Sequence, residues 1–543
     1  MDFVLTLHSH LPYVLHHGRW PHGSDWLCEA AVDTYLPLLE RLHELADARV
    51  PAPLTIGFTP VLANQLVSPA LTQELEAFFD QREKACAEAP AGLAATGETA
   101  LLPLVDFWKA RLARLRALFH AIDCDIVGAF RRLQDAGRLE IIGSAATHGY
   151  LPLLARDESI RLQLTVGRSE HRRLFGRDPV GCWVPECAYR PRAGQRPGVE
   201  EQLSATGFGY FFTDAHLAKA GEPLASYGDA PLGAERFDVD PPVTRARAVA
   251  KAVRSPYLAY RVTPPRARPP VAALVRDPRS SMQVWSRHQG YPGDEWYLEF
   301  HKIRWPGGLK LWRVTGAEVD LGAKRAYDPA AAHGRVEDHA RHFAHLIAAI
   351  AAEHTGAGDV VVAPFDTELF GHWWFEGVDF IAALYRELRH HTGVRPVTAA
   401  QHLQSHPARV ALRLAEGSWG VNGDHSMWLN AGTAWTWPRL RALEDAFWKA
   451  APGALASPQT RPVLAQAARE LLLAQSSDWQ FMISTGAVPD YAERRFQLHC
   501  DDAERLIKGL AAPSSVEQLT DELARRDELF PDVLESVAEV LEA

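Results

Sequence analysis

Short apolar runs alternate with longer amphipathic stretches through roughly the first 400 residues of the chain. The apolar runs hold four or five residues each, as strands buried on both faces do, and they predict strands at 3–7, 54–58, 139–142, 181–184, 210–213 and 359–363. Apolar residues at helical spacing predict helices between them, over 30–46, 125–136, 157–174, 336–354 and 377–391. Strands and helices that alternate in this way predict an α/β fold, either a parallel β/α barrel or a doubly wound sheet.

The pattern changes after about residue 435, where strand-like runs stop. Segments rich in Ala and Leu then predict consecutive helices at 439–450, 460–482, 489–511 and 515–541. Residues 222–270 are instead rich in Pro, Gly and Arg, which predicts a long loop or inserted subdomain, either a lid or a solvated excursion without a role. We therefore expect a β/α domain over 1–405, with this insertion, and an all-helical domain over 406–543.

Composition and charge narrow the class of protein. A chain with 47% hydrophobic and 23% charged residues folds into globular domains, and a formal charge of −10 leaves no basic excess for nucleic acid or anionic lipid. No apolar window reaches the ~20 residues of a membrane span, and the first residues lack the basic flank of a signal peptide. Six scattered cysteines do not form a disulfide framework. These features predict a cytoplasmic protein that binds neither nucleic acid nor membrane.

Polar residues with catalytic potential follow four of the predicted strands. His8 and His10 follow the first, His148 the third, Glu186 the fourth and Asp366 the sixth. In a parallel β/α barrel the carboxyl ends of the strands converge on one rim, where such enzymes hold their catalytic groups. Two carboxyl groups of this kind suit glycosidic bond chemistry, which in retaining enzymes needs them about 5–5.5 Å apart. Either carboxylate alone is also compatible with a structural role as a helix cap.

Histidine and tryptophan suggest what this rim binds. His8, His10 and His148 are either metal ligands or hydrogen-bonding partners of sugar hydroxyls. The chain holds 16 Trp residues, several in predicted loops, Trp373 and Trp419 among them. Their flat rings suit the apolar face of a pyranose, while the indole N–H meets a hydroxyl. Together with paired carboxylates they predict a carbohydrate substrate.

Five segments carry a resemblance to a known family. They are HSHLPY at 8–13, THGYLPLL at 147–154, WVPECAY at 183–189, FDTELFGHWW at 365–374 and EGSWG at 416–420. In this order they resemble the motifs of glycoside hydrolase family 57, and most closely those of its 1,4-α-glucan branching enzymes. The resemblance extends over nearly the whole chain.

The resemblance implies a distorted, TIM-like (β/α)7 barrel and a retaining double displacement without metal or cofactor. It implies that Glu186 is the nucleophile and Asp366 the general acid/base. It also implies glucan contacts for Arg276, Gly293, Trp419 and Asp478, the last of these from the C-terminal helical domain, whose helices would form one side of the glucan groove. The family tyrosine on a mobile loop has Tyr260 and Tyr257 as its candidate equivalents here.

The leading hypothesis is a branching enzyme that takes α-1,4-glucan, such as amylose or glycogen, as both donor and acceptor, and works as a monomer or small homo-oligomer. A 4-α-glucanotransferase or α-amylase of the same family would use the same carboxylates. A metal-dependent polysaccharide deacetylase or mannosidase-like enzyme is a second class, which His8 and His10 would support. A non-catalytic glucan-binding protein is a third.

Overall fold

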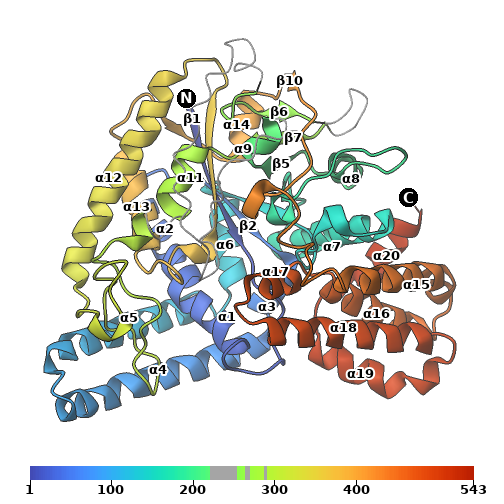
Figure 1. Ribbon diagram of the computed structural model, residues 1–543, viewed down its shortest axis with the longest axis horizontal. Coiled ribbons are helices and arrows are strands. Elements are labelled where there is room, and N and C mark those ends of the chain that lie inside the picture. The colour runs from blue at the N-terminus through green and yellow to red at the C-terminus, as the bar shows by residue number, and fades with distance from the viewer. Residues whose placement is uncertain (220–253, 263–269, 286–289, 543) are drawn as a thin grey trace.

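The computed structural model describes residues 1–219, 254–262, 270–285 and 290–542 (Figure 1). A barrel of seven parallel strands forms its centre, with the strands in the order β7-β5-β4-β3-β2-β1-β8. The seven strands are β1 (Asp2–Ser9), β2 (Leu54–Phe58), β3 (Leu139–Ser144), β4 (Gly181–Trp183), β5 (Tyr210–Thr213), β7 (Ala272–Val275) and β8 (Val360–Asp366). The first five and β8 are the strands that the apolar runs predict.

The barrel closes through one short seam between β7 and β8. Arg276 forms a parallel bridge with Val362, and the Asp277 N–H donates a hydrogen bond of 2.8 Å to the Val362 carbonyl. With this seam the sheet becomes a (β/α)7 barrel of irregular form. The predicted fold class is confirmed.

Three short strands lie outside the ring. β6 (Tyr260–Arg261) pairs antiparallel with β7, β10 (Val410–Ala411) extends β6, and β9 (Arg395–Pro396) pairs with the start of β1. β6 lies within the stretch expected to be an insertion. Most of that stretch, and with it the expected lid, falls on residues 220–253 and 263–269, outside the described residues.

Helices surround the barrel. They are α1 (Ser24–Ala30), α2 (Leu36–Asp47), α3 (Pro60–Leu66), α4 (Pro69–Ala95), α5 (Leu102–Ala121), α6 (Ile126–Asp135), α7 (Asp157–Phe175), α8 (Val199–Ala205), α9 (Ala215–Ala218), α11 (Pro278–Trp285), α12 (Pro329–Glu353), α13 (Gly377–Leu388) and α14 (Ala399–Ser405). The α4–α5 pair, which the sequence did not predict, projects away from the barrel (Figure 1). Its apolar residues do not gather on one face as they do in α6, so it lacks the periodic signal.

The C-terminal part is helical as expected, from α15 to α20 (lower right in Figure 1). Its helices are α15 (Thr436–Ala456), α16 (Arg461–Ala474), α17 (Asp478–Thr485), α18 (Pro489–Gly509), α19 (Glu517–Arg526) and α20 (Val533–Glu542). The single helices predicted over 460–482 and 515–541 are wrong, because each is broken in two. The first break begins α17 at Asp478.

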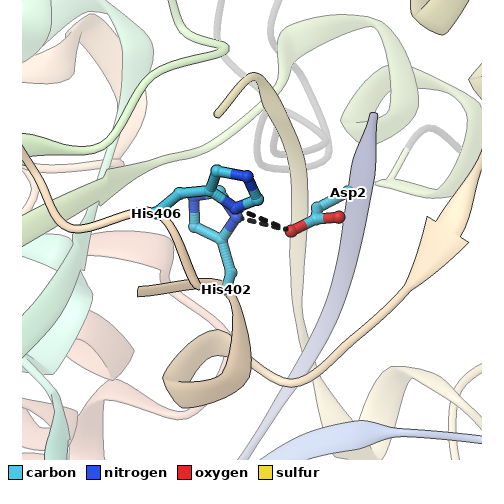
Figure 2. A group of neighbouring side chains, drawn as sticks. All are labelled: Asp2, His402 and His406. Carbon is cyan, nitrogen blue, oxygen red and sulfur yellow. Dashed lines mark hydrogen bonds and ion pairs between the residues drawn. The ribbon is translucent and has the colours of Figure 1, made fainter. Parts of the chain in front are cut away.

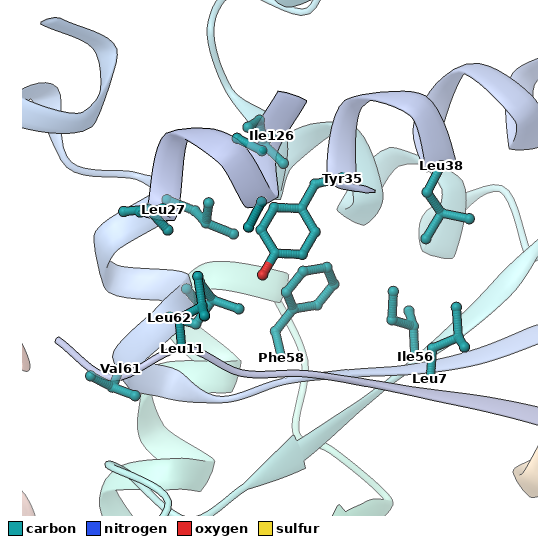
Figure 3. Packing of buried hydrophobic residues seen from close by; sticks show 14 of the residues in the cluster. Leu7, Leu11, Leu27, Tyr35, Leu38, Ile56, Phe58, Val61, Leu62 and Ile126 are labelled. Carbon is teal, nitrogen blue, oxygen red and sulfur yellow. The ribbon is translucent and has the colours of Figure 1, made fainter. Parts of the chain in front are cut away.

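The main core joins the barrel strands to the surrounding helices (Figure 3). Leu7 of β1 and Ile56 of β2 lie against Leu38 of α2, while Tyr35 lies in a π-helical turn, η1 (Ala31–Tyr35), between α1 and α2. Such turns often occur at functional sites. Tyr35 packs among these apolar side chains, and its hydroxyl reaches the candidate site described below.

Among the described residues, no helix is long and apolar enough to cross a membrane.

Candidate active site

Glu186 lies just after β4, in a turn of 3-10 helix, η4 (Pro185–Cys187). Its backbone φ is 60°, a left-handed conformation that costs a non-glycine residue about 1–3 kcal/mol. Two backbone contacts hold this turn. Tyr189 forms a β-bridge with Gly417, and the Trp419 N–H donates a hydrogen bond of 3.0 Å to the Glu186 carbonyl. The Trp419 indole then donates to Glu186 Oε2 at 2.8 Å. The strained turn therefore presents the carboxylate to one fixed donor.

Asp366 is the last residue of β8 and lies in register with His8 of β1. Burial raises the pKa of Asp366 to about 8, the Glu368 carboxylate adds to this effect, and Arg276 opposes it. Its charge is also among those that raise the pKa of Glu186, so the two carboxyl groups interact electrostatically. The barrel rim therefore brings the two predicted catalytic residues into one site.

The carboxylate of Glu186 has a raised pKa as well. Burial raises it to about 8, the Trp419 hydrogen bond opposes the rise, and the charges of Asp366 and Asp478 add to it. Both values lie above neutral pH, so at pH 7 these two carboxyl groups hold at least one proton. One protonated and one ionised carboxyl group is the state that a general acid and a nucleophile require.

His8, His10 and His148 form a stack beside the carboxylates. The rings of His10 and His148 lie 4.0 Å apart, and His8 stacks on Trp183 at 4.6 Å. His8 Nε2 and His148 Nε2 share a hydrogen bond of 3.0 Å, and His148 Nδ1 lies 3.8 Å from Glu186 Oε1. Burial, and then the neighbouring imidazoles, hold the pKa of His8 and of His148 well below the usual range. These two rings are therefore neutral and can both donate and accept hydrogen bonds.

Hydrogen bonds occupy most of the ring nitrogens in this stack. His10 bonds to Thr59 Oγ1 through Nδ1 and to Asp478 Oδ2 through Nε2, both at 2.9 Å, and His148 Nδ1 bonds to Ser477 Oγ at 2.9 Å. Among the described residues, the groups with metal-binding geometry lie elsewhere. The stack of His8, His10 and His148 therefore forms a hydrogen-bonded polar wall of the site.

The C-terminal helices contribute directly to this wall. Asp478 is the first residue of α17, and Ser477 directly precedes it. Burial on its own would raise the pKa of Asp478, but the interaction with His10 and a hydrogen bond from Ser476 outweigh it, and the pKa is lowered. Asp478 is therefore ionised. The break after α16, missed by the sequence pattern, is what turns these side chains toward the barrel rim.

Arg276 directly follows β7, at the same end of the barrel as the two carboxylates. Its guanidinium forms a 2.6 Å ion pair with Asp214, which follows β5, and lies 5.3 Å from the ring of Trp419. Both charged side chains are buried. The cation therefore lies close enough to lower the pKa of Asp366 while its own position is fixed by Asp214.

Glu368 is a site residue that the sequence analysis did not single out, although it lies in a recognised motif. Its Oε1 accepts a 2.5 Å hydrogen bond from the Tyr35 hydroxyl and one of 3.1 Å from the His10 N–H. Burial raises its pKa to about 8. The signal available in the sequence was that Glu368 lies only two positions after Asp366. Tyr35 gave none, because it lies far away in the sequence in an apolar segment.

Trp373 and Gly293 lie outside the buried cluster. Trp373 is 51% exposed, and its ring packs on Phe300 at 4.6 Å. Its loop turns at Gly371, where φ is 109° and a Cβ would lie 2.0 Å from the Asp33 carbonyl oxygen. Gly293 ends a short 3-10 turn, η5 (Tyr291–Gly293), for which no described contact to the carboxylates exists. Its role stays a prediction.

Tyr260 lies apart from the site. It is fully buried in β6, and its hydroxyl donates a 2.7 Å hydrogen bond to the Ser255 carbonyl. Tyr257 is also buried, with its ring 4.2 Å from that of His354. The structure therefore does not bring either tyrosine to the carboxylates, because strand formation and core packing occupy both side chains. A tyrosine on a loop of residues 220–253 would lie outside the described residues.

A family model described as glycosyl hydrolase family 57 matches residues 4–415, three quarters of the chain. The chain belongs to glycosyl hydrolase family 57. The resemblance carried by the five sequence motifs is thereby confirmed. A second model, described as the C-terminal region of 1,4-alpha-glucan branching enzyme, matches residues 440–537, which include Asp478.

Relatives of this family 57 chain have known names and structures. The 1,4-alpha-glucan branching enzyme TK1436 of Thermococcus kodakarensis is 39% identical over 549 residues, which cover 98% of this chain and 77% of that protein. The crystal structure of a GH57-type branching enzyme from Pyrococcus horikoshii matches with a TM-score of 0.87 and 37% identity, over 99% of this chain and 96% of that one. The alpha-amylase AmyC of Thermotoga maritima matches with a TM-score of 0.83 and 29% identity, over 99% of both chains.

Proposed function

We propose that this family 57 chain is a 1,4-α-glucan branching enzyme. It cleaves an α-1,4 bond in a glucan such as amylose or glycogen and transfers the released segment to a 6-hydroxyl, so that one kind of glucan is both donor and acceptor. The names of its relatives support this activity. The strongest support within the chain is the hydrogen bond of Asp478 to His10, because it joins the region that matches the branching enzyme C-terminal model to the rim that holds the carboxylates.

In the first half-reaction, the ionised Glu186 attacks the anomeric carbon while Asp366 gives its proton to the departing glycosidic oxygen. The C–O bond to the leaving glucan breaks, and an ester bond forms between the sugar and Glu186. The Trp419 N–H supports the ionised form of Glu186, while burial, with a smaller contribution from the Glu368 carboxylate, keeps the proton on Asp366. These environments match the two roles.

In the second half-reaction, Asp366 takes the proton of the acceptor 6-hydroxyl, whose oxygen attacks the anomeric carbon and releases Glu186. The net configuration is retained and the carboxyl groups return to their starting states. Water in place of the 6-hydroxyl would give hydrolysis. The ratio of branching to hydrolysis is therefore decided by how well the site admits glucan and excludes water.

The substrate contacts that we propose follow from position. We propose that His8, His10, His148 and the ionised Asp478 contact sugar hydroxyls at the reacting end of the site. His8 Nδ1 has no hydrogen-bond partner among the described residues, whereas His10 and His148 would exchange a hydrogen bond that they make within the protein. Trp373, exposed on the surface, offers a stacking face to a more distant glucose unit. Arg276 and Trp419 orient the carboxylates. No step requires a metal or cofactor.

An α-amylase is the second candidate, since the match to AmyC extends over both full chains. Linear amylose separates the two activities. The purified protein is incubated with it, and α-1,6 linkages are counted by proton NMR beside new reducing ends. Branching predicts new α-1,6 linkages with few new reducing ends, and an amylase gives reducing ends without branch points.

We further propose a cytoplasmic role in glycogen biosynthesis, with residues 1–405 as the catalytic domain and 406–543 as the helical domain that completes the glucan groove. All six cysteines are free, which suits a reducing compartment. A monomer or small homo-oligomer suffices, because every proposed catalytic residue lies in one chain.

A further inference from the structure

Asp2, His402 and His406 lie close together, with both imidazoles facing the Asp2 carboxylate (Figure 2). They lie at the end of the barrel opposite the candidate active site. Asp2 begins β1, while His8 and His10 lie at its other end, so at 3.3 Å per residue the two places are about 20 Å apart. His402 lies in α14 and His406 directly follows that helix. None of these three residues takes part in the proposed reaction.

The spacing of the two histidines suits a shared ligand. Residues four apart lie on one face of a helix, a spacing with which paired imidazoles bind zinc in other proteins. His402 Nδ1 lies 2.9 Å and His406 Nδ1 3.5 Å from the same oxygen, Asp2 Oδ2. Ligand atoms bonded at about 2.0–2.1 Å to one tetrahedral ion lie roughly 3.3 Å apart, so this arrangement needs little movement to admit one.

The bonding of His406 leaves capacity for an ion, whereas His402 Nδ1 shares a hydrogen bond of 2.9 Å with Asp2 Oδ2 that an ion would replace. His406 Nδ1 is buried and has no hydrogen-bond partner among the described residues, although it faces the carboxylate. His402 is fully buried, whereas the His406 side chain is 36% exposed, so an ion could enter from that side. Two imidazoles and a carboxylate, with a water as fourth ligand, are a donor set that Zn²⁺ accepts.

Arg395 is the group that competes with an ion. Its Nε lies 2.7 Å from Asp2 Oδ1 and its terminal nitrogen 2.9 Å from Oδ2. The side chain is 57% exposed and can release Oδ2 while it keeps Oδ1, which would leave it as an outer partner of a liganding carboxylate. Its positive charge nevertheless lowers the affinity for a cation.

A second cluster with similar geometry does not offer the same capacity. His17, His499 and Asp527 also approach one another, but His499 already uses both ring nitrogens, for Glu470 at 2.8 Å and for Arg495 at 3.0 Å. Arg526 lies against Asp527 as well. This group is a filled ion-pair network.

We propose that Asp2, His402 and His406 form a structural site for a divalent transition metal ion, with Zn²⁺ as the preferred ion. The ion would tie the start of β1 to α14. It would stabilise the end of the barrel that takes no part in the chemistry, because β/α barrels hold their catalytic groups at the other end. The site is independent of the proposed branching activity.

Co²⁺ tests the site directly, because a protein-bound ion absorbs in the visible region when its coordination is tetrahedral. Tag-free, chelator-treated full-length protein is titrated with CoCl₂ while the visible absorption is recorded. Zn²⁺ is then added to displace the bound Co²⁺. We expect one Co²⁺ per chain. His406→Ala, which alters a half-exposed side chain and so keeps the fold, should weaken binding about 100-fold or more, since loss of an outer partner alone costs 10- to 100-fold.

Two further variants complete the test. Arg395→Gln should tighten binding about tenfold, because it removes the competing charge. His333→Ala, which removes a histidine that is 67% exposed on α12, should bind as the unmodified protein does. Branching activity of His406→Ala should be unchanged at low temperature. Absence of stoichiometric binding, or binding that His406→Ala leaves intact, would overturn the proposal.

Discussion

The indole N–H of Trp419 donates a hydrogen bond of 2.8 Å to Glu186 Oε2, and the main chain of the same tryptophan bonds to the Glu186 carbonyl. One residue from the segment after the barrel thus fixes both the backbone and the carboxylate of the proposed nucleophile. It also supplies the hydrogen bond that opposes the rise in the pKa of Glu186 caused by burial. The carboxylate is therefore oriented before substrate arrives.

Removal of either carboxyl group should abolish turnover while the fold persists. Glu186→Gln and Asp366→Asn are each expected to lower kcat by about 1,000-fold or more, since each acts in a step that no other group replaces. The α-1,6 linkages formed from amylose give the measurement, and circular dichroism checks the fold. Glu337→Gln, on the exposed face of α12, is the control. A Glu186→Gln preparation with substantial activity would refute the mechanism.

Glu186→Gln should also stabilise the protein, in a way that depends on pH. The pKa of Glu186 is raised from 4.5 to about 8, so its favourable contribution is fully present below pH 4.5 and is lost as the pH rises through about 8. The glutamine variant cannot ionise, so it does not lose this stability as the pH rises. We expect its Tm to exceed that of the unmodified protein by several degrees near pH 9 and the difference to shrink toward pH 5. Equal Tm values at both ends of the range would contradict the raised pKa.

Glu368→Gln should change the pH profile of the reaction. The charge of Glu368 raises the pKa of Asp366, so its removal lowers that pKa and shifts the alkaline limb of kcat/KM to lower pH. The amide oxygen can still accept the bonds from Tyr35 and His10. Glu376→Gln is the matched control, because Glu376 is also buried and bound by a tyrosine but is not among the groups that shift the pKa of Asp366. An unshifted limb in Glu368→Gln would remove Glu368 from the mechanism.

Asp478→Asn tests the contribution of the C-terminal helices. The change removes a charge that is hydrogen-bonded to His10, an interaction worth about 1.5–3 kcal/mol, so kcat/KM should fall about 10- to 100-fold. Asp490→Asn, at an 80% exposed position in α18, should leave the rate unchanged. Hydrolysis and branching are measured together in both variants. If Asp478→Asn lost neither, α17 would have no part in the site.

Trp373→Ala tests the proposed stacking surface. Because Trp373 is largely exposed, its loss should raise KM for amylose about three- to tenfold, with little change in kcat or in Tm. Trp435→Ala, at another exposed tryptophan, should not change KM. The comparison is made with short and long amylose chains. A fall in kcat with unchanged KM would instead indicate that Trp373 acts at the reacting bond.

The sequence predicted the elements whose signal is local. Buried strands such as β1 and β8 show as apolar runs, and Glu186 and Asp366 stand out because they directly follow such runs. Tyr35 and Glu368 meet across more than 300 residues, and no local pattern reports that contact. The break before Asp478 was missed because apolar spacing continues through it. Tyr260 was expected near the substrate, but strand pairing with β7 buries it.

The short seam between β7 and β8 is an expected site of local unfolding. The other neighbours in the ring pair over at least two residues, whereas this closure depends on the single bridge at Arg276 and the adjacent bond from Asp277. Amide hydrogens there should exchange with solvent sooner than those of β1. Because Arg276 lies against Trp419, each such opening would also disturb the nucleophile, so heat should inactivate the molecule before it unfolds.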